Sequence, residues 1–371
     1  MLKVSKVHVI GNQMKKIKIL HQVLDPSGIG GVSSEFRALQ NSKLSEKYDF
    51  KAMILKDIHA GINLHDILFY LRQIKKYEPD IVHIRGAAID GLNAIIAARI
   101  YGKCKILTTV HGMYSDLVYI SSFKRWISKN IIERAIFMLS HGISCVCQNA
   151  TKRKYFNAYR KKMLPYVYNR MPHYDIELKN TYKKLIRLQY GIDTNDLVCV
   201  LVGRMTREKG LLTLEKMFST YSFPSKLVFL FVGDGDYKKQ FEENCKRYNV
   251  RTIFTGMQTD VKQFYFASDM FLQPSLHENH SIALLEACAA GIPSIATNCG
   301  GNSEIVYNGY TGKLIHIDSP HEMYDAIIEL CNTTILSQYS KNVQNMKYPQ
   351  FSDEECDNAL DSVYKKILKN E

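Results

Sequence analysis

Short apolar runs alternate along the chain with longer segments in which apolar residues recur every three or four positions. Such runs predict buried strands of a parallel sheet, and the longer segments predict the helices that cover it. In the first half the expected strands are residues 18–24, 50–55, 81–84, 106–110 and 142–147. In the second half they are residues 198–202, 227–232, 252–254, 270–273 and 294–296. This alternation predicts an α/β fold with two Rossmann-like, doubly wound domains.

A polar segment with a proline, residues 169–180, interrupts the alternation and predicts the domain boundary. The chain of 371 residues is too long for one small core. We expect an N-terminal domain over residues 1–172 and a C-terminal domain over residues 173–352. Residues 1–13 precede the natural start of the first strand. We expect them to form an extra strand, a tail or another extension of the domain.

Positive charge is concentrated in the first domain. Residues 1–172 contain 28 Lys and Arg against 11 Asp and Glu, whereas the remaining residues contain 21 and 25. This imbalance indicates an acidic partner. The partner can be an anionic membrane surface, a nucleic acid or a phosphorylated substrate. No apolar run approaches the roughly 18 residues of a membrane span.

Two glutamates stand eight residues apart in the stretch HENHSIALLEACAAGIPSIATN. Ser281 predicts a helix N-cap, which places Glu278 and the next main-chain amides where an anion is favoured. Glu286 lies further along that helix, where its carboxylate suits a vicinal diol such as a ribose. A surface helix with two solvated glutamates remains the alternative.

Three further junctions between a strand and a helix carry candidate chemistry. The loop after residues 198–202 contains three cations, Arg204, Arg207 and Lys209. Arginine and lysine together are suited to binding a diphosphate. The alternative is a basic loop that only faces solvent. His111 ends the strand that precedes Gly112, at the ligand-binding edge of a parallel sheet. The glycines of DPSGIGGV permit a close approach of the backbone to a ligand, or only a tight turn.

Together these motifs resemble glycosyltransferase family 4, the retaining enzymes of GT-B fold. GRMTREKG resembles the family's G-R-x-x-x-x-K-G loop, and ENHSIALLE resembles its pair of glutamates with seven residues between them. GIGGV, TVHG, VGDG and FTG follow in the family's order, and YVYN resembles the end of its first domain. The resemblance implies two domains that face each other across a cleft, with a helix over residues 353–371 returning to the first.

By this resemblance, a nucleotide-sugar binds in the cleft. Glu278, His111, Arg204 and Lys209 are the implied catalytic residues: the two cations hold the diphosphate, Glu278 contacts the sugar, and His111 reaches the sugar from the first domain. Glu286 would hold the ribose, and main-chain groups of residues 255–257 would bind the base. The residues implied to bind the donor are Gly30, Gly31, Arg204, Lys209, Met257, Asn279, His280, Ser281, Ile282 and Glu286.

The resemblance implies retaining transfer from a UDP- or GDP-sugar to a glycan or lipid-linked acceptor in polysaccharide synthesis. It implies no metal, because Arg204 and Lys209 replace the cation and no D-x-D motif lies among the matched segments. We expect a cytoplasmic enzyme peripheral at the inner membrane, docked through its basic first domain, and no nucleic-acid partner. The alternatives are a nucleotide-sugar epimerase or hydrolase of this fold, and a non-catalytic membrane- or nucleic-acid-binding protein.

Three positions depart from the family pattern. Asn279 and His280 stand where relatives often have small residues, and we expect their bulk to reshape the sugar pocket. Arg85, in HIRG, stands where relatives often have histidine or a small residue, which is expected to alter the acceptor side.

Overall fold

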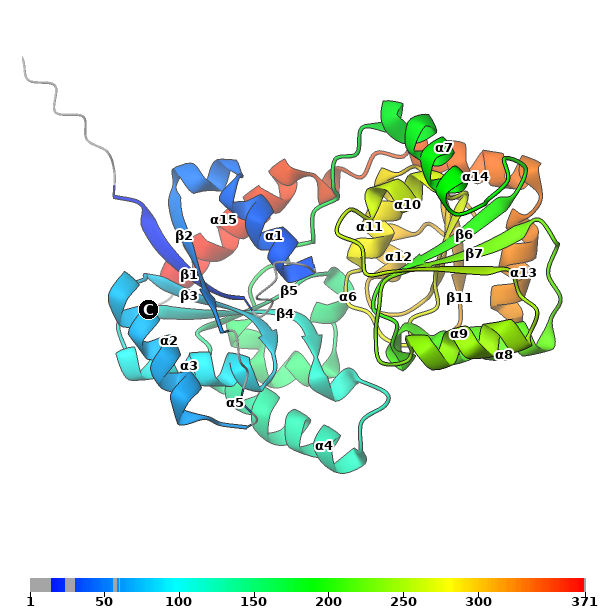
Figure 1. The fold of residues 1–371 in the computed structure, drawn as a ribbon. Helices are drawn as coiled ribbons and strands as arrows, with labels where there is room; N and C mark the ends of the chain where they lie inside the picture. The colour runs from blue at the N-terminus through cyan, green and yellow to red at the C-terminus, as the bar shows by residue number, and fades with distance from the viewer. Residues whose placement is uncertain (1–14, 24–30, 56–58, 60, 370–371) are drawn as a thin grey trace, which may run out of the picture.

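Two parallel α/β domains lie side by side in the computed structural model, which describes residues 15–23, 31–55, 59 and 61–369 (Figure 1). The first sheet has the strand order β2-β1-β3-β4-β5 and the second has the order β11-β10-β9-β6-β7-β8. The strands are β1 (Ile17–Val23), β2 (Tyr48–Ile54), β3 (Ile81–Ala87), β4 (Lys105–Met113), β5 (Gly142–Cys145), β6 (Leu197–Val202), β7 (Leu227–Val232), β8 (Thr252–Gly256), β9 (Met270–Gln273), β10 (Ser294–Thr297) and β11 (Gly312–Ile315).

Helices cover both faces of each sheet, as in a doubly wound fold. In the first domain they are α1 (Gly31–Gln40), α2 (Leu64–Tyr77), α3 (Ile89–Tyr101), α4 (Ser122–Ile127), α5 (Glu133–Leu139) and α6 (Gln148–Thr151). The later helices are α7 (Lys179–Gln189), α8 (Leu211–Thr220), α9 (Lys238–Arg247), α10 (Lys262–Ala267), α11 (Ile282–Ala289), α12 (Asn302–Ile305), α13 (Pro320–Leu330), α14 (Thr333–Asn345) and α15 (Asp353–Lys369).

Each sheet separates two apolar cores. Helices α2, α3 and α5 pack on one face of the first sheet, and α1 and α15 pack on the other. In the second domain, α7, α10 and α11 cover one face, and α8, α9 and α13 the other. Because both faces are covered, central strands can be apolar along their whole length, as β7 shows with all six residues buried.

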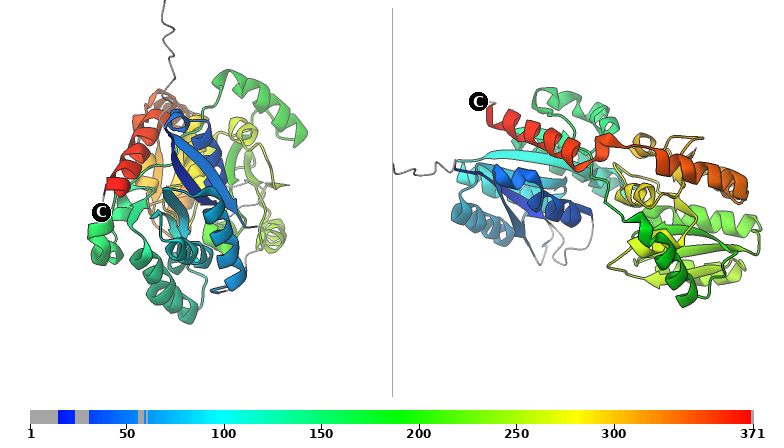
Figure 2. Two further views of the ribbon diagram at one scale, coloured as in Figure 1. Left: turned by 90° about the vertical axis from the view of Figure 1, so that its left-hand side faces the viewer. Right: turned by 90° about the horizontal axis from the view of Figure 1, so that it is seen from above.

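The final helix returns to the first domain, where Figure 2 shows α15 lying along the first sheet. Tyr364 of α15 lies within hydrogen-bond distance of His83 of β3, at 3.0 Å, and Asp361 accepts a hydrogen bond from Tyr48 of β2 at 2.8 Å. The chain therefore joins the domains twice, before α7 and before α15.

Each predicted strand is present, with small changes at its ends, and Leu24 lies outside the described residues. Two differences affect the cleft. β3 extends to Ala87 and β4 to Met113, so Arg85 and His111 lie within strands and share one sheet face. β11 was not predicted. Among the described residues, no helix is long and apolar enough to cross a membrane.

Candidate active site

A pocket of about 620 Å³ lies between the carboxyl ends of the two sheets, within the size range of small-ligand sites. The first domain contributes the end of β4 and the loop that follows it; the second contributes the loops after β6, β7 and β9. His111, Arg204, Lys209, Glu278 and Asn279 all line this pocket. The structure therefore brings together the four predicted catalytic residues, which are far apart in the sequence.

Lys209 and Glu278 form an ion pair across two loops of the second domain. Ser275 donates a second hydrogen bond to the same oxygen of Glu278, at 3.0 Å. Gly210, with φ of +77°, follows Lys209, and a side chain there would place Cβ 2.0 Å from the carbonyl oxygen of Pro274. This close approach of the two loops places the lysine against the glutamate. Without a ligand, the two charges predicted to contact the donor satisfy each other.

Arg204 is exposed at the rim of the pocket. Its guanidinium has no hydrogen bond or ion pair to any residue that the structure describes. An arginine with free donors beside a lysine is suited to a diphosphate, because its fork can bind two oxygens at once.

His111 is neutral at physiological pH. Burial first, and then the charges of Arg85 and His280, lower its pKa to about 3. The Nε2 atom is buried and has no partner among the described residues. A neutral imidazole with an unused nitrogen can exchange a hydrogen bond with a sugar hydroxyl.

Asn279 connects the two domains instead of facing the pocket with a free amide. Its side chain is buried, Nδ2 donates to the carbonyl oxygen of His111 at 2.8 Å, and Oδ1 accepts from Arg153 at 2.7 Å. Arg153 also donates to Asp116 at 2.5 Å. The side chain therefore serves the contact between the domains.

His280 lies in the same interface. Its ring packs on Tyr168 and Phe351 with centroids 5.0 and 5.1 Å away, and burial lowers its pKa to about 3. Its carbonyl oxygen accepts from the side-chain amide of Asn169 at 2.9 Å. The side chain is a packing element between the linker and α11.

Ser281 is the N-cap of α11, as predicted: its Oγ accepts from Leu284 N at 3.3 Å and donates to Gln273 at 2.8 Å. Ile282 is the first residue of the helix. Glu286 lies outside the lining of the pocket and accepts from Tyr265 at 2.9 Å. Burial raises the pKa of Glu286 to about 7. Tyr265 is the one hydrogen-bond partner of this carboxyl among the described residues.

The remaining predicted donor residues lie at the ends of other elements. Met257 is exposed directly after β8. Gly31 begins α1, and Gly30 lies outside the described residues.

Several residues around the pocket were not predicted. Glu208 accepts from the main-chain N of Tyr119 at 2.7 Å, which joins the loop after β6 to the loop after β4. Asp116 pairs with Arg153 at 2.5 Å and with His277 at 3.4 Å. These contacts join segments far apart in the chain, so no local pattern indicates them.

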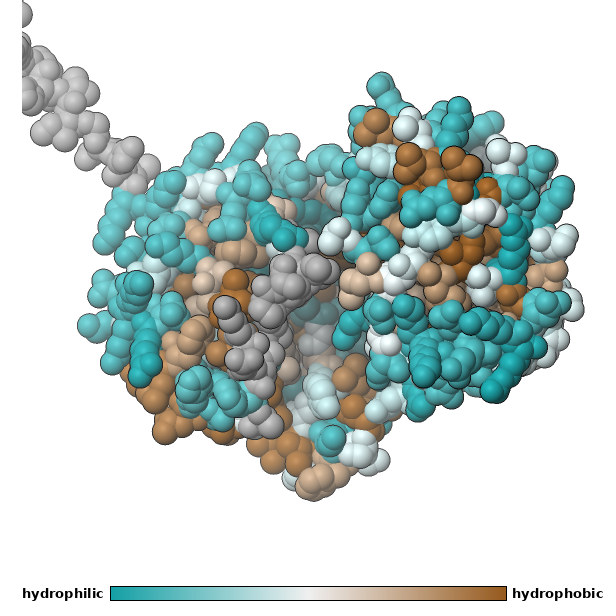
Figure 3. Space-filling model, viewed as in Figure 1, coloured by the Kyte–Doolittle hydropathy of each residue, from teal (hydrophilic) through white to brown (hydrophobic). Residues whose placement is uncertain are grey.

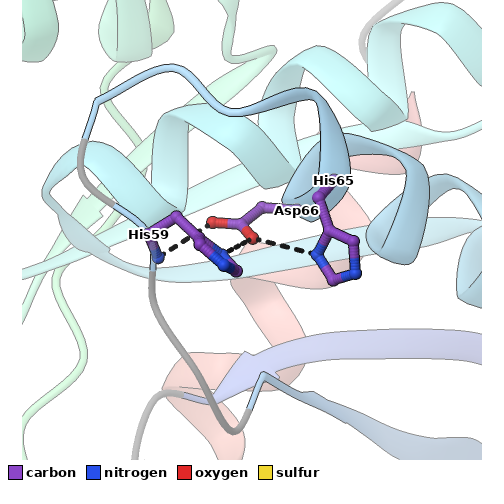
Figure 4. A group of neighbouring side chains, drawn as sticks. All are labelled: His59, His65 and Asp66. Atoms are coloured by element: carbon purple, nitrogen blue, oxygen red, sulfur yellow. Dashed lines mark hydrogen bonds and ion pairs between the residues drawn. The ribbon is translucent and has the colours of Figure 1, made fainter.

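A separate cluster of possible metal ligands lies at the start of α2 (Figure 4). Nδ1 of His59 lies 2.6 Å, and Nδ1 of His65 3.6 Å, from Oδ1 of the buried Asp66. It is the one such group among the described residues. Both rings already face the carboxylate, and none of the three lines the pocket between the domains.

The sequence matches two family models: Glycosyltransferase Family 4 over residues 50–167 and Glycosyl transferases group 1 over residues 183–346, together most of the chain. The chain belongs to glycosyltransferase family 4. It is therefore a glycosyltransferase.

Named relatives of this glycosyltransferase act on different acceptors. It is 27% identical, over 89% of its own length and 92% of the relative's, to the Escherichia coli UDP-Gal:alpha-D-GlcNAc-diphosphoundecaprenol alpha-1,3-galactosyltransferase. It is 25% identical to the N-acetyl-alpha-D-glucosaminyl L-malate synthase of Bacillus anthracis, over 85% of its own length and 87% of the relative's.

Solved glycosyltransferases share the fold. Anabaena Alr3699/HepE in complex with UDP and glucose superposes with a TM-score of 0.75 at 17% identity, over 94% of this chain and 99% of that one. Sucrose-phosphate synthase from Thermosynechococcus elongatus gives a TM-score of 0.74 at 17% identity, over 96% and 100%. The fold is therefore GT-B, as the sequence predicted.

Proposed function

We propose that the protein transfers a sugar, with retention of anomeric configuration, from a UDP-sugar to a hydroxyl of a glycan or lipid-linked acceptor in cell-surface polysaccharide synthesis. The pocket between the domains is the observation that carries this proposal. It combines Arg204, which has no ion pair to a described residue, with the Lys209–Glu278 ion pair and a neutral His111. The named substrates of the Escherichia coli relative and the UDP-bound neighbours support the choice of nucleotide and acceptor. A GDP-sugar is the competing donor.

The proposed chemistry needs positive charge at the leaving diphosphate. Arg204 and Lys209 supply that charge without a metal, and Lys209 divides its interaction between Glu278 and the phosphates when donor binds. The acceptor oxygen forms its bond to the anomeric carbon on the face that the nucleotide leaves. The bond from that carbon to the phosphate oxygen breaks, and the acceptor proton passes to the departing phosphate.

Glu286 is proposed to hold the ribose. Tyr265 occupies one of its oxygens, and the carboxyl is shielded from water, which raises its pKa to about 7. A ribose diol would supply the hydrogen bonds that water no longer gives, and would favour the ionised form.

The acceptor is proposed to reach the site from an anionic membrane at the cytoplasmic face. Phe123 and Trp126 of α4 and Ile131 beyond it are 71%, 56% and 52% exposed, and Lys124 and Lys129 lie among them. Figure 3 shows brown, hydrophobic residues at the lower edge of the first domain, where Figure 1 places α4. Aromatic side chains interleaved with cations are suited to the interface of an anionic bilayer.

Thermal stabilisation by nucleotides tests the proposal. UDP, GDP and ADP are added to the wild type, to Arg204→Gln, and to Arg72→Gln as a matched control from the exposed side of α2. A ligand that binds only the folded protein raises its melting temperature. We expect UDP to stabilise the wild type and the control, and to stabilise Arg204→Gln much less. Equal stabilisation of all three proteins would contradict the site.

A requirement for acceptor separates a transferase from an epimerase or hydrolase. With UDP-sugar alone, a transferase releases UDP slowly, and the addition of acceptor accelerates the release. An epimerase converts its donor at a rate that no acceptor changes.

A further inference from the structure

A buried arginine that has no ion pair with any described carboxylate lies on the first domain's side of the cleft. Arg85 of β3 is 8% exposed. Its Nε donates to Nδ1 of His21 at 3.1 Å, and its two terminal nitrogens have no hydrogen bond or ion pair to a described residue. A buried charge is strongly disfavoured unless it is paired, so this guanidinium is the exception that calls for an explanation.

The neighbours of Arg85 do not neutralise it. Burial, and the charge of Arg85, hold the pKa of His21 and of His83 far below their usual value, so both rings are neutral. Thr109, the register partner of Arg85, lies with its hydroxyl 2.7 Å from Nε2 of His83. The two rings and the hydroxyl nearest the arginine on this strand face are thus neutral.

The other buried arginine nearby has its own carboxylates. Arg170 lies 3.6 Å from Glu35, 3.5 Å from Asp353 and 2.8 Å from Asp357. Glu35 also accepts from the main-chain N of Arg170 at 3.0 Å. Glu35 therefore contacts Arg170, and it acts on Arg85 only through its charge, without a hydrogen bond or ion pair.

Arg85 lines a small cavity beside the donor pocket. The cavity measures about 30 Å³, which is enough for about two water molecules. His111 lines both this cavity and the donor pocket, so the two spaces meet at that residue. The charged side chains that line the cavity are Glu35, Arg85 and Arg170.

We propose that Arg85 anchors a subsite for an oxyanion of the acceptor, a carboxylate or a phosphate, next to the sugar-transfer site. This inference rests on the proposed function. Two oxygens of such a group take the space of two waters and match the two free nitrogens of the guanidinium. The donor diphosphate is already assigned to Arg204 and Lys209 on the other domain, so the oxyanion belongs to the acceptor.

Anion binding to the UDP-saturated protein tests the subsite. Inorganic phosphate and acetate are titrated separately at constant ionic strength, and binding is followed by calorimetry and by melting temperature. The proteins are the wild type, Arg85→Gln, Arg85→Lys and the exposed control Arg72→Gln. The two titrations distinguish a phosphate-type from a carboxylate-type acceptor.

We expect the wild type and Arg72→Gln to bind at least one probe with the same affinity. Arg85→Gln should bind it at least about tenfold more weakly, because a charge-assisted hydrogen-bond pair is lost. Arg85→Lys keeps the charge but not the fork, and should bind several-fold more weakly. It also provides the comparison if Arg85→Gln does not fold.

Two results would overturn the inference: no binding of either probe to the UDP-bound wild type, or equal affinity in the wild type and the Arg85 variants. The proposed function fails separately, through the absence of UDP binding to the wild type.

Discussion

Replacement of Asn279 by alanine tests whether its side chain holds the two domains together. The amide makes two contacts to the first domain: a neutral hydrogen bond to the His111 carbonyl at 2.8 Å and a charge-assisted one from Arg153 at 2.7 Å. Bonds of these two kinds contribute about 0.5–1.5 and 1.5–3 kcal/mol, so the pair stabilises the contact between the domains by about 2–4.5 kcal/mol. That corresponds to a roughly 30- to 2000-fold shift of an equilibrium between joined and separated domains.

Small-angle scattering of the free protein and initial-rate kinetics measure this effect. We expect Asn279→Ala to have a larger radius of gyration and a reduced kcat/KM for donor. Both should recover towards wild-type values at saturating UDP, because bound nucleotide restores contacts across the cleft. The protein should stay folded, since Glu304 still accepts from Gln148 and Asn149 across the interface, at 3.0 and 2.7 Å.

An exposed asparagine of α7 provides the matched control for this substitution. Asn180→Ala should leave scattering and kinetics unchanged. An unchanged radius of gyration together with an unchanged kcat/KM in Asn279→Ala would refute the reasoning.

The remaining predictions concern charge, protonation, metal and membrane. Arg204→Ala and Lys209→Ala should each lower turnover by roughly 10²- to 10³-fold with an unchanged circular dichroism spectrum, and near-normal turnover in both would contradict their role. The folded-state pKa of Glu286 is raised from 4.5 to about 7, so the stability that its protonated carboxyl contributes is lost as the pH rises through that range. The melting temperature of the wild type should therefore fall over that range relative to the melting temperature of Glu286→Gln. Parallel curves of melting temperature against pH would refute this. Excess EDTA should leave turnover unchanged, and loss restored by a divalent cation would show a metal requirement. In vesicle flotation, the wild type should bind anionic vesicles in preference to neutral ones, and this preference should be weaker in the double variant Phe123→Ser/Trp126→Ser. The absence of any preference in the wild type would contradict the membrane proposal.

Local patterns in the sequence predicted the second domain most closely. The runs that form β7 and β9 are continuous and apolar, and their predicted ends coincide with the observed ones. Ser281 followed by an apolar helix gave the N-cap of α11. β11 was missed because Gly312–Ile315 is short, contains a lysine and lacks a continuous apolar run.

The shared site was predictable only in part. The strand–loop–helix junctions identified Arg204, Lys209 and Glu278, because the carboxyl ends of parallel strands lie at one edge of a sheet. The direction of the Asn279 side chain, and the contact of Arg85 with a histidine ring in place of a described carboxylate, depend on segments more than 20 residues apart. Such contacts leave no signal in the local sequence.

Release of nucleoside diphosphate from a panel of nucleotide-sugars tests the central proposal most directly. The wild type and Arg204→Ala are incubated with UDP-glucose, UDP-galactose, UDP-N-acetylglucosamine and GDP-mannose, with and without a lipid-linked glycan acceptor. We predict that one donor gives nucleotide release that the acceptor accelerates and that Arg204→Ala abolishes. Release that is equal in the two proteins, or no release from any donor with acceptor present, would contradict the assignment of the pocket between the domains as the transfer site.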